Sequence, residues 1–246
     1  MRSGTQSERL CSLDDLSPAD VQGLLAVAAR IGAPGVAGPA LEGRHVVVVS
    51  EAPASTSAAA LAAAAAALGA AVVRLRPDAL QLEDRQRLRE TARLLGRLYQ
   101  LIGCDGLRPS AMAGLCRWAG VPVLGDVAGP CHPARMLGDL LAMQEHAGRP
   151  AAHITLGLAD APRSAVGRAW GRVSALTGLQ LVSVGPAAAG RARSRCDFVL
   201  GPGPHDPPGA PSTLQVREAE GDARADLGLL QASARHRLLQ SLLSSL

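Results

Sequence analysis

Three hydroxyl side chains, those of Ser55, Thr56 and Ser57, stand together between an apolar segment and a segment made almost entirely of alanine. The apolar segment at 46–50 is typical of a buried strand, and the alanine-rich segment at 58–67 is typical of a helix. A strand, a tight turn and a helix in this order direct the backbone N–H groups of the first helical turn toward an anion. The turn contains no lysine, arginine or glycine pair. The segment therefore indicates an anion site without the cations that usually complete one.

The segment "CHPARMLGDLLAMQEHAG" contains a second candidate group, formed by Cys131, His132 and Arg135. Apolar residues recur at helical spacing from Pro133 to Gly148, so His132 stands where the residue that caps the helix belongs. Two interpretations of His132 stay open: a capping, partly buried side chain kept for packing, or a functional group of the site. Cys131 is interpreted as a small buried residue, because the sequence offers no base at a fixed spacing that would activate a thiolate.

These groups need a scaffold, and the rest of the sequence has the alternation of an α/β fold. The apolar runs are continuous and are separated by helical segments, which is typical of a parallel sheet covered on both faces. The predicted strands are 46–50, 71–75, 101–103, 121–124, 179–184, 197–200 and 213–216. The pattern restarts after Gly148 at "HITLGLAD", so we predict two α/β lobes joined by the long helix that follows His132.

Both ends of the chain carry helical sequence. Ser17 is the expected N-cap of the first helix, and Gly32 is placed to end it. The last helix, from about residue 229 to 246, is amphipathic and needs a partner surface, so we expect it beside the first helix on the first lobe. The expected division of the chain is a first lobe of residues 1–148 together with this last helix, and a second, shortened lobe of residues 149–228.

Composition argues against several classes of function. The chain has 246 residues, of which 48% are hydrophobic and only 2% aromatic, and its formal net charge of +4 is carried without any lysine. Scattered arginines with so few rings to stack on bases do not favour nucleic acid binding. No apolar run is long enough to span a bilayer, the N-terminal sequence lacks a leader pattern, and the five cysteines include no CxxC pair. We therefore expect a cytoplasmic protein with reduced thiols, no membrane contact, no metal and no cofactor.

Several segments, in the same order along the chain, resemble the ornithine and aspartate carbamoyltransferases, and most closely the ornithine branch. "CHPARMLGDLLAMQEHAG" is similar to the family's His-Pro-Thr-Gln motif and the linking helix after it. "ETARLLGRLY" resembles Asp-Thr-Ala-Arg-Val-Leu, "AGVPVLGD" resembles the Ala-Gly-Val-Pro-Val stretch, and "QASARHRLLQSLL" is similar to the closing helix. The resemblance implies two Rossmann-like lobes with parallel sheets, a homotrimer with sites between subunits, and transfer of a carbamoyl group from carbamoyl phosphate to an amino acid.

The same resemblance indicates which phosphate-binding residues are missing. The family's Ser-Thr-Arg-Thr-Arg turn falls on residues 54–58, where Thr56 and Ala58 replace the two arginines. A further family arginine falls on Asp105, and the glutamine of the histidine motif is replaced by Arg135. A charge-assisted hydrogen bond contributes about 1.5–3 kcal/mol, so these losses weaken phosphate binding strongly. Arg135 is the cation expected to compensate if any does.

The resemblance gives His132 a specific role. In the family the motif histidine hydrogen-bonds the carbonyl oxygen of the carbamoyl group and polarises it, so His132 is the candidate catalytic residue. Ser55, Thr56 and Ser57 are then the neutral phosphate ligands that remain, at a helix N-terminus across the same crevice from His132.

The second lobe matches the family less well. Asp160 corresponds to the aspartate of Gly-Asp-Ala-Arg-Asn-Asn, but Ser164 replaces an asparagine that would face ornithine. Asp197 is the candidate for the aspartate that precedes a Ser-Met-Gly loop, yet "GPGPHDPPG" follows it and no His-Cys-Leu-Pro occurs. His205 and Asp206 in that loop are interpreted as solvated turn residues instead of a new acid/base pair.

Three functions stay open. The first is a family protein of carbamoyl-group metabolism without the standard reaction, a pseudoenzyme that acts by weak ligand binding or by assembly, as a homotrimer or with an intact paralogue. The second is an active carbamoyltransferase with an altered substrate that uses His132 and Arg135. The third is a Rossmann-like protein for a small metabolite, although no Gly-x-Gly-x-x-Gly fingerprint supports nucleotide binding. We expect the first.

Overall fold

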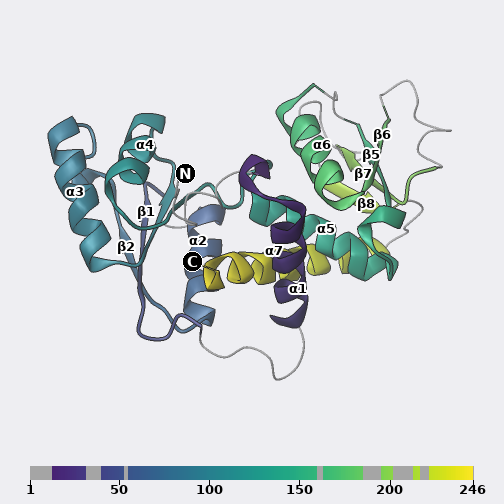
Figure 1. Cartoon of the computed structure of the whole chain (residues 1–246), viewed down its shortest axis with the longest axis horizontal. Coiled ribbons are helices and arrows are strands. Elements are labelled where there is room, and N and C mark those ends of the chain that lie inside the picture. The colour runs from purple at the N-terminus through teal and green to yellow at the C-terminus, as the bar shows by residue number, and fades with distance from the viewer. Residues whose placement is uncertain are drawn as a thin grey trace.

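The structure, a computed structural model, contains two four-stranded sheets separated by long helices (Figure 1). It describes residues 13–31, 40–52, 55–159, 163–184, 195–201, 213–216 and 222–245. The strands of the first sheet are β1 (His45–Ser50), β2 (Ala71–Leu75), β3 (Leu101–Asp105) and β4 (Val123–Gly125). Those of the second are β5 (Thr155–Leu158), β6 (Gln180–Ser183), β7 (Phe198–Gly201) and β8 (Thr213–Val216). The two α/β lobes expected from the sequence are confirmed.

The helices account for most of the remaining described chain. They are α1 (Pro18–Ile31), α2 (Thr56–Ala67), α3 (Arg85–Leu98), α4 (Pro109–Trp118), α5 (Pro133–Ala147), α6 (Ala165–Thr177) and α7 (Asp222–Ser244). Two helices were not predicted from the sequence: α4, which has only 10 residues, and α6, which contains two glycines, the poorest helix formers after proline. Ser17 caps α1 as expected, because its Oγ accepts a hydrogen bond from the Asp20 N–H at 3.2 Å. Gly32 lies outside the described residues.

The central strands of the first sheet, β1 and β3, are buried on both faces, whereas the edge strand β2 is mostly exposed. Its order is β2-β1-β3-β4, with every neighbouring pair parallel. Val46 and Val48 of β1 belong to the apolar cluster that includes α2, whereas Val47 and Val49 belong to the cluster that includes α3 and α4. In Figure 1, α3 and α4 lie on the outer side of this sheet, and α2 lies on the side toward α7. This double cover explains why the β1 sequence is continuously apolar.

The second sheet differs from the prediction at one edge. Its order is β6-β5-β7-β8, and β5 is parallel to both β6 and β7. The edge strand β8 instead runs antiparallel to β7. Residues 202–212 connect β7 to β8, and this connection is slightly shorter than the dozen or more residues that a parallel crossover needs. The expectation of parallel strands therefore holds for β5, β6 and β7 and is wrong for β8.

The long helices α5 and α7 pack against each other between the two sheets (Figure 1). Met136, Leu137 and Leu140 of α5 are fully buried, as are Leu238 and Leu242 of α7. These residues belong to one apolar cluster that also contains residues of α1, α2, α6 and both sheets. The pair of helices is therefore the common core onto which both lobes are built.

A polar contact lies inside this apolar pair. Asp139 of α5 is only 4% exposed and accepts hydrogen bonds from Arg235 Nε at 2.6 Å and from Gln231 Nε2 at 3.2 Å. Gly138 allows the two helices to approach, because a Cβ atom there would lie 2.7 Å from the Cα atom of Arg235. Separating the two helices would leave the buried carboxylate of Asp139 without its partner, which costs free energy. The ion pair therefore fixes how α5 and α7 are placed against each other.

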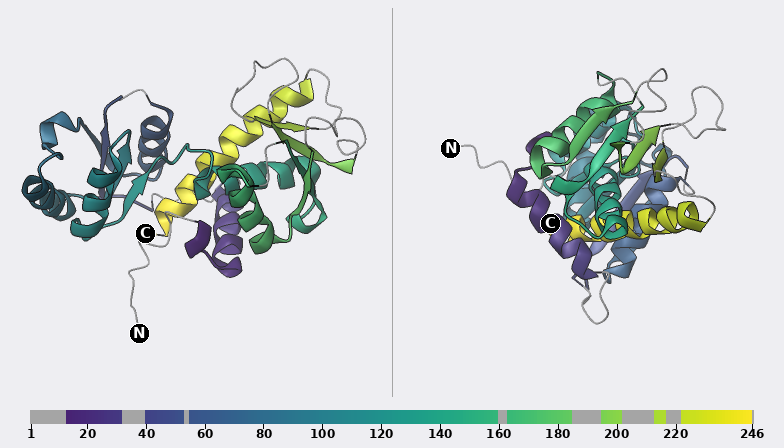
Figure 2. Two further views of the ribbon diagram at one scale, coloured as in Figure 1. Left: turned by 90° about the horizontal axis from the view of Figure 1, so that it is seen from above. Right: turned by 90° about the vertical axis from the view of Figure 1, so that its right-hand side faces the viewer.

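The first helix completes the layer, and it lies beside α7 (Figure 2). Ser241 Oγ of α7 donates a hydrogen bond to the Leu24 carbonyl of α1 at 3.0 Å. Arg237 of α7 forms a bidentate ion pair with Glu145 of α5, at 2.8 and 2.7 Å. The expected packing of the last helix on the first lobe is confirmed, although α7 begins at Asp222, before the expected residue 229. The division of the chain into domains at residue 148 stays a prediction.

We predict that Gly138→Ala destabilises the protein by about 1–3 kcal/mol, because its methyl group would meet the backbone of α7 and push the helices apart. The measurement is chemical denaturation followed by circular dichroism. The matched control is Gly23→Ala in α1, where an added Cβ meets nothing within 4 Å. That control should be neutral or stabilising by up to about 1 kcal/mol, because alanine is the better helix former. Equal stability of both variants would contradict the close approach at Gly138.

Candidate functional site

The candidate residues of the first lobe follow the carboxyl ends of its strands. The chain moves from β1 to β2 on one side of the sheet and from β3 to β4 on the other, so the strand order reverses between β1 and β3. In open parallel sheets, ligands bind outside the carboxyl ends of the strands at such a reversal. Ser50 and Asp105, which end these two strands, are partners in the register of the sheet.

The hydroxyl of Ser50 is directed onto the carboxylate of Asp105. Its Oγ lies 3.2 Å from Asp105 Oδ2 and 2.9 Å from the carbonyl oxygen of Ala52. The position where the resemblance places a family arginine thus holds a half-buried carboxylate at the strand reversal. This charge opposes the binding of a phosphate there.

The serine-threonine turn forms the start of α2. Ser55 is the N-cap, with an extended backbone, and its Oγ accepts a hydrogen bond from the Ala58 N–H at 3.1 Å. Ser57 is buried, and its Oγ donates to Asp126 Oδ1 and accepts from the Ala128 N–H, both at 3.1 Å. Thr56 is exposed. Two of the three hydroxyls are therefore engaged within the protein, and Thr56 is the one on the surface.

Through its two hydrogen bonds, Ser57 connects the start of α2 to the loop between β4 and α5. Asp126 begins this loop with a left-handed backbone, φ 44°, and its carbonyl accepts the Gly129 N–H at 2.8 Å. The Gly129 carbonyl in turn accepts the His132 N–H at 3.1 Å. The turn before α2 and the residue before α5 are thus connected through a short series of hydrogen bonds.

His132 is the N-cap of α5 and is 8% exposed. Its Nδ1 accepts a hydrogen bond from the Ala134 N–H at 3.1 Å, so the neutral ring carries its proton on Nε2. Nε2 is buried and has no hydrogen-bond partner among the described residues. Burial lowers the pKa of His132 to about 4, because the imidazolium would lose its hydration. At neutral pH His132 is therefore an uncharged donor.

Arg135 is in the first turn of α5 and lies at a pocket that Thr56, the first residue of α2, also lines. Its Nη1 donates to the Ala128 carbonyl at 3.0 Å. Together with Thr56 it lines a pocket of about 320 Å³, whose opposite wall is α7 with Arg235 and His236. Burial lowers the pKa of Arg135, and the charge of Arg235 adds to this effect. Two guanidinium groups thus lie near one another in this pocket.

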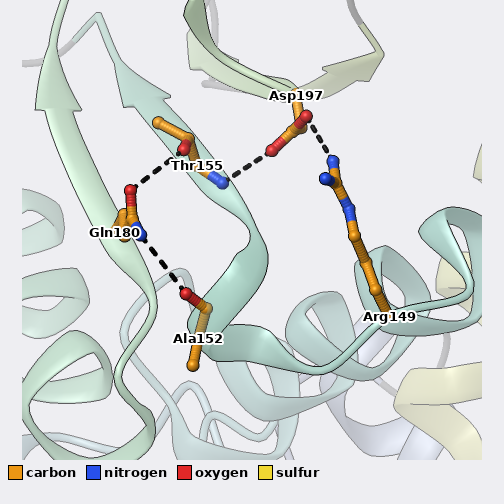
Figure 3. Close-up of polar contacts among 5 residues, drawn as sticks. All are labelled: Arg149, Ala152, Thr155, Gln180 and Asp197. Atoms are coloured by element: carbon orange, nitrogen blue, oxygen red, sulfur yellow. Dashed lines mark hydrogen bonds and ion pairs between the residues drawn. The ribbon is translucent and has the colours of Figure 1, made fainter.

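The two second-lobe candidates that the structure describes, Asp197 and Ser164, make contacts within their own part of the fold. Asp197 precedes β7 at the amino ends of the strands, where its Oδ2 accepts the Thr155 N–H at 2.8 Å and its Oδ1 pairs with Arg149 (Figure 3). Ser164 caps α6, with its Oγ accepting the Gly167 N–H at 2.9 Å. These contacts connect strands and helices within the lobe.

Several candidates lie outside the described residues. They are Ala54, Asp160, His205 and Asp206. The structure therefore describes the first-lobe site far more fully than the acceptor site.

Three residues of the site were missed by the sequence analysis. Asp126 could have been found, because a polar residue directly after a predicted strand lies at the carboxyl edge of the sheet. Arg235 and His236 gave no such signal, since they lie on a helix about a hundred residues along the chain from α5 and only packing brings them to the pocket.

Comparison with known families identifies the fold. The family described as "Aspartate/ornithine carbamoyltransferase, carbamoyl-P binding domain" matches residues 8–145. This chain belongs to the aspartate/ornithine carbamoyltransferase family. The resemblance inferred from the sequence motifs is confirmed, and the matched region includes His132 and all of α5 except its last two residues, 146 and 147.

Solved structures agree with this assignment. The chain is 25% identical to the ornithine carbamoyltransferase of Thermus thermophilus, with a TM-score of 0.61 over 76% of this chain and 67% of that one. It is 26% identical to the ornithine carbamoyltransferase of Gloeobacter violaceus, with a TM-score of 0.54 over 74% of this chain and 62% of that one. A putative aspartate carbamoyltransferase from Trypanosoma cruzi is 17% identical and shares the fold, with a TM-score of 0.69 over 99% and 98% of the two chains. The chain thus spans about two thirds of the length of the two ornithine carbamoyltransferases.

Among the helices that the structure describes, none has both the length and the apolarity that crossing a membrane requires.

We predict that acidification destabilises the protein, because His132 is buried in its neutral form and has to be protonated at low pH. Its pKa is about 4 in the folded protein against 6.5 when unfolded, so the stabilisation is present above pH 6.5 and is lost as pH falls toward 4. The loss is about 3 kcal/mol. His132→Asn retains a capping acceptor and cannot titrate, so urea denaturation between pH 7 and 4 should give a flatter profile. His153→Gln, at an exposed position, is the control and should keep the wild-type slope. A slope unchanged by His132→Asn would contradict the buried neutral imidazole.

Proposed function

We propose that this carbamoyltransferase-family protein does not transfer a carbamoyl group from carbamoyl phosphate to ornithine. It acts instead within carbamoyl-group metabolism as a pseudoenzyme, by binding a small ligand weakly or by assembly with other chains. The observation that supports this most is the charge at the reversal of the first sheet. Asp105 brings a carboxylate there, while Thr56 and Ala58 bring no cation to the start of α2.

The free energy of phosphate binding that is lost with the missing arginines decides between a pseudoenzyme and an active transferase. Carbamoyl phosphate carries about two negative charges, and arginine binds such oxyanions through two parallel N–H groups. The loss of two or three charge-assisted hydrogen bonds corresponds to about 5 kcal/mol, or several thousand-fold in affinity. The N-terminus of α2 and its hydroxyls offset only part of this, since Ser55 and Ser57 already have partners.

The position of Ala58 strengthens the argument. Its side chain is 1% exposed and lies at a cavity of about 50 Å³ that Ser50, Arg74 and Arg76 also line. This volume holds one or two water molecules but no phosphate ester. Arg76 is already paired with Asp78 at 3.3 Å. Arg76, the residue after β2, is therefore a poor replacement for the arginines missing from the turn.

An active transferase with an altered substrate is the second candidate, and Arg135 is the observation that favours it. Arg135 lies in the same pocket as Thr56, and it follows His132, whose Nε2–H is the donor that carbonyl polarisation would need. However, Nε2 is shielded from solvent in this conformation, so a ligand would reach it only after movement of the surrounding residues. We therefore rank this function below the first.

We also propose a cytoplasmic homotrimer or an association with an intact paralogue, on the basis of the family alone. Sedimentation equilibrium of the purified chain, alone and mixed with an ornithine carbamoyltransferase, tests this proposal. A monomer under both conditions would exclude both assemblies.

The activity itself is tested by citrulline formation from carbamoyl phosphate and ornithine. We expect no turnover by the purified protein and no saturable binding of carbamoyl phosphate at micromolar concentration, because the phosphate lacks its cations. The measurements are a citrulline assay and isothermal titration calorimetry. Citrulline made by the unmodified chain would disprove the proposed function, and micromolar binding removed by Arg135→Gln would favour the second candidate.

A gain-of-binding variant makes this test sharper. We predict that Thr56→Arg combined with Asp105→Arg binds carbamoyl phosphate at least about tenfold more tightly than the wild type, because both substitutions place a cation at the crevice. Ala58 is left unchanged, since an arginine would not fit its buried position. The control combines Ala66→Arg with Glu42→Arg, two exposed positions that give the same change in net charge. Equal gains in both proteins would show a general charge effect and contradict the role of the crevice.

A further inference from the structure

The pocket between α2, α5 and α7 has features that the proposed function does not use. Its volume is about 320 Å³, which is within the range of small-molecule sites. Thr56, the first residue of α2, and Ala60, one helical turn later, line it, so the pocket extends from the start of this helix along its side. Arg235 and Leu239 face them from α7. The pocket is thus distinct from the crevice at Ser50 and Asp105.

The charges in this pocket favour one negative charge on a ligand. Arg235 is already paired with the buried Asp139 at 2.6 Å. Arg135 uses one N–H for the Ala128 carbonyl, which leaves most of its five donors for other partners. His236 brings little charge at neutral pH, because burial lowers its pKa. One guanidinium charge is therefore left without a carboxylate at hydrogen-bond distance among the described residues.

The remaining walls of the pocket are apolar. Ala60, Val127, Ala134 and Leu239 line it with aliphatic groups, and none of them can hydrogen-bond a ligand through its side chain. A doubly charged phosphate would find one compensating cation and an unfavourable apolar surface. A small aliphatic monocarboxylate would suit both the single free guanidinium and the apolar walls. Its carboxylate would pair with the guanidinium, and its hydrocarbon would replace water at the walls.

We propose that this pocket binds a small aliphatic monocarboxylate, with the carboxylate on Arg135 and the hydrocarbon against Ala60 and Leu239. A bidentate contact fits the planar guanidinium and the two carboxylate oxygens. The inference goes beyond the proposed function, because it assigns a ligand class to a pocket that includes Thr56 of the turn but neither Ser50 nor Asp105 of the strand reversal. The side chains that contact the ligand come from α2, α5 and α7, so the bound ligand would also stabilise the packing of these three helices.

The test uses 3-methylbutanoate as the probe and 3-methylbutan-1-ol, its uncharged counterpart, as the comparison, on the full chain. Calorimetric titration should show saturable binding of the carboxylate and none of the alcohol, and thermal denaturation should show a higher Tm with the carboxylate. Inorganic phosphate should bind at least about tenfold more weakly. No saturable binding of 3-methylbutanoate, or tighter binding of phosphate, would overturn the proposal.

Two variants assign the binding to this pocket. Arg135→Gln should weaken 3-methylbutanoate binding by about tenfold or more, because the charge-assisted contact is lost. Ala60→Leu should abolish it by filling the pocket, whereas Ala66→Leu, at an exposed position on the same helix, should leave it unchanged. Arg235 is left intact, since its removal would leave Asp139 unpaired.

The outcomes separate this inference from the proposed function. Binding with wild-type affinity in folded Arg135→Gln or Ala60→Leu protein would overturn the monocarboxylate site, with folding checked by circular dichroism. Citrulline formation by the wild type would overturn the proposed function and would not affect the 3-methylbutanoate titration. The two proposals therefore fail independently.

Discussion

The ion pair between Asp139 of α5 and Arg235 of α7 is the interaction on which the arrangement of this protein depends. It lies in an otherwise apolar helix pair, and Gly138 beside it allows the helix backbones to approach. Burial raises the pKa of Asp139, and hydrogen bonding from Arg235 offsets part of that rise. A buried pair of this kind contributes little net stability, but it penalises every other placement of the two helices. The main effect of this ion pair is thus to specify one packing arrangement of α5 against α7.

Helix α5 connects the two lobes through its ends. Its first residues follow His132, at the carboxyl edge of the first sheet, and its last turn leads through Gly148 to Arg149, whose ion pair with Asp197 holds the start of the second sheet (Figure 3). The same helix that orients the candidate catalytic residue therefore also positions the second lobe. A change in the α5–α7 contact would affect both, because the two lobes share one apolar cluster.

The electrostatics of the first lobe differ from what the family resemblance implies. Asp105 ends β3 and Asp126 follows β4, so two carboxylates lie at this edge of the sheet. The cations in the pocket at Thr56 come from α5 and α7, whereas the turn before α2 supplies none. A ligand that suits these charges carries less negative charge than carbamoyl phosphate. It would bind closer to α5 and α7 than to the strand reversal between β1 and β3.

The sequence by itself determined the elements and their order. Continuous apolar runs such as Val46–Val49 predicted buried parallel strands, Ser55 and His132 were found at helix starts, and the histidine segment indicated the family. Local periodicity carries this information because strands and helices bury their faces at fixed spacings. Only the tertiary structure decided that Arg235 meets Asp139 and that β8 turns back antiparallel, since contacts between residues distant in sequence leave no local pattern.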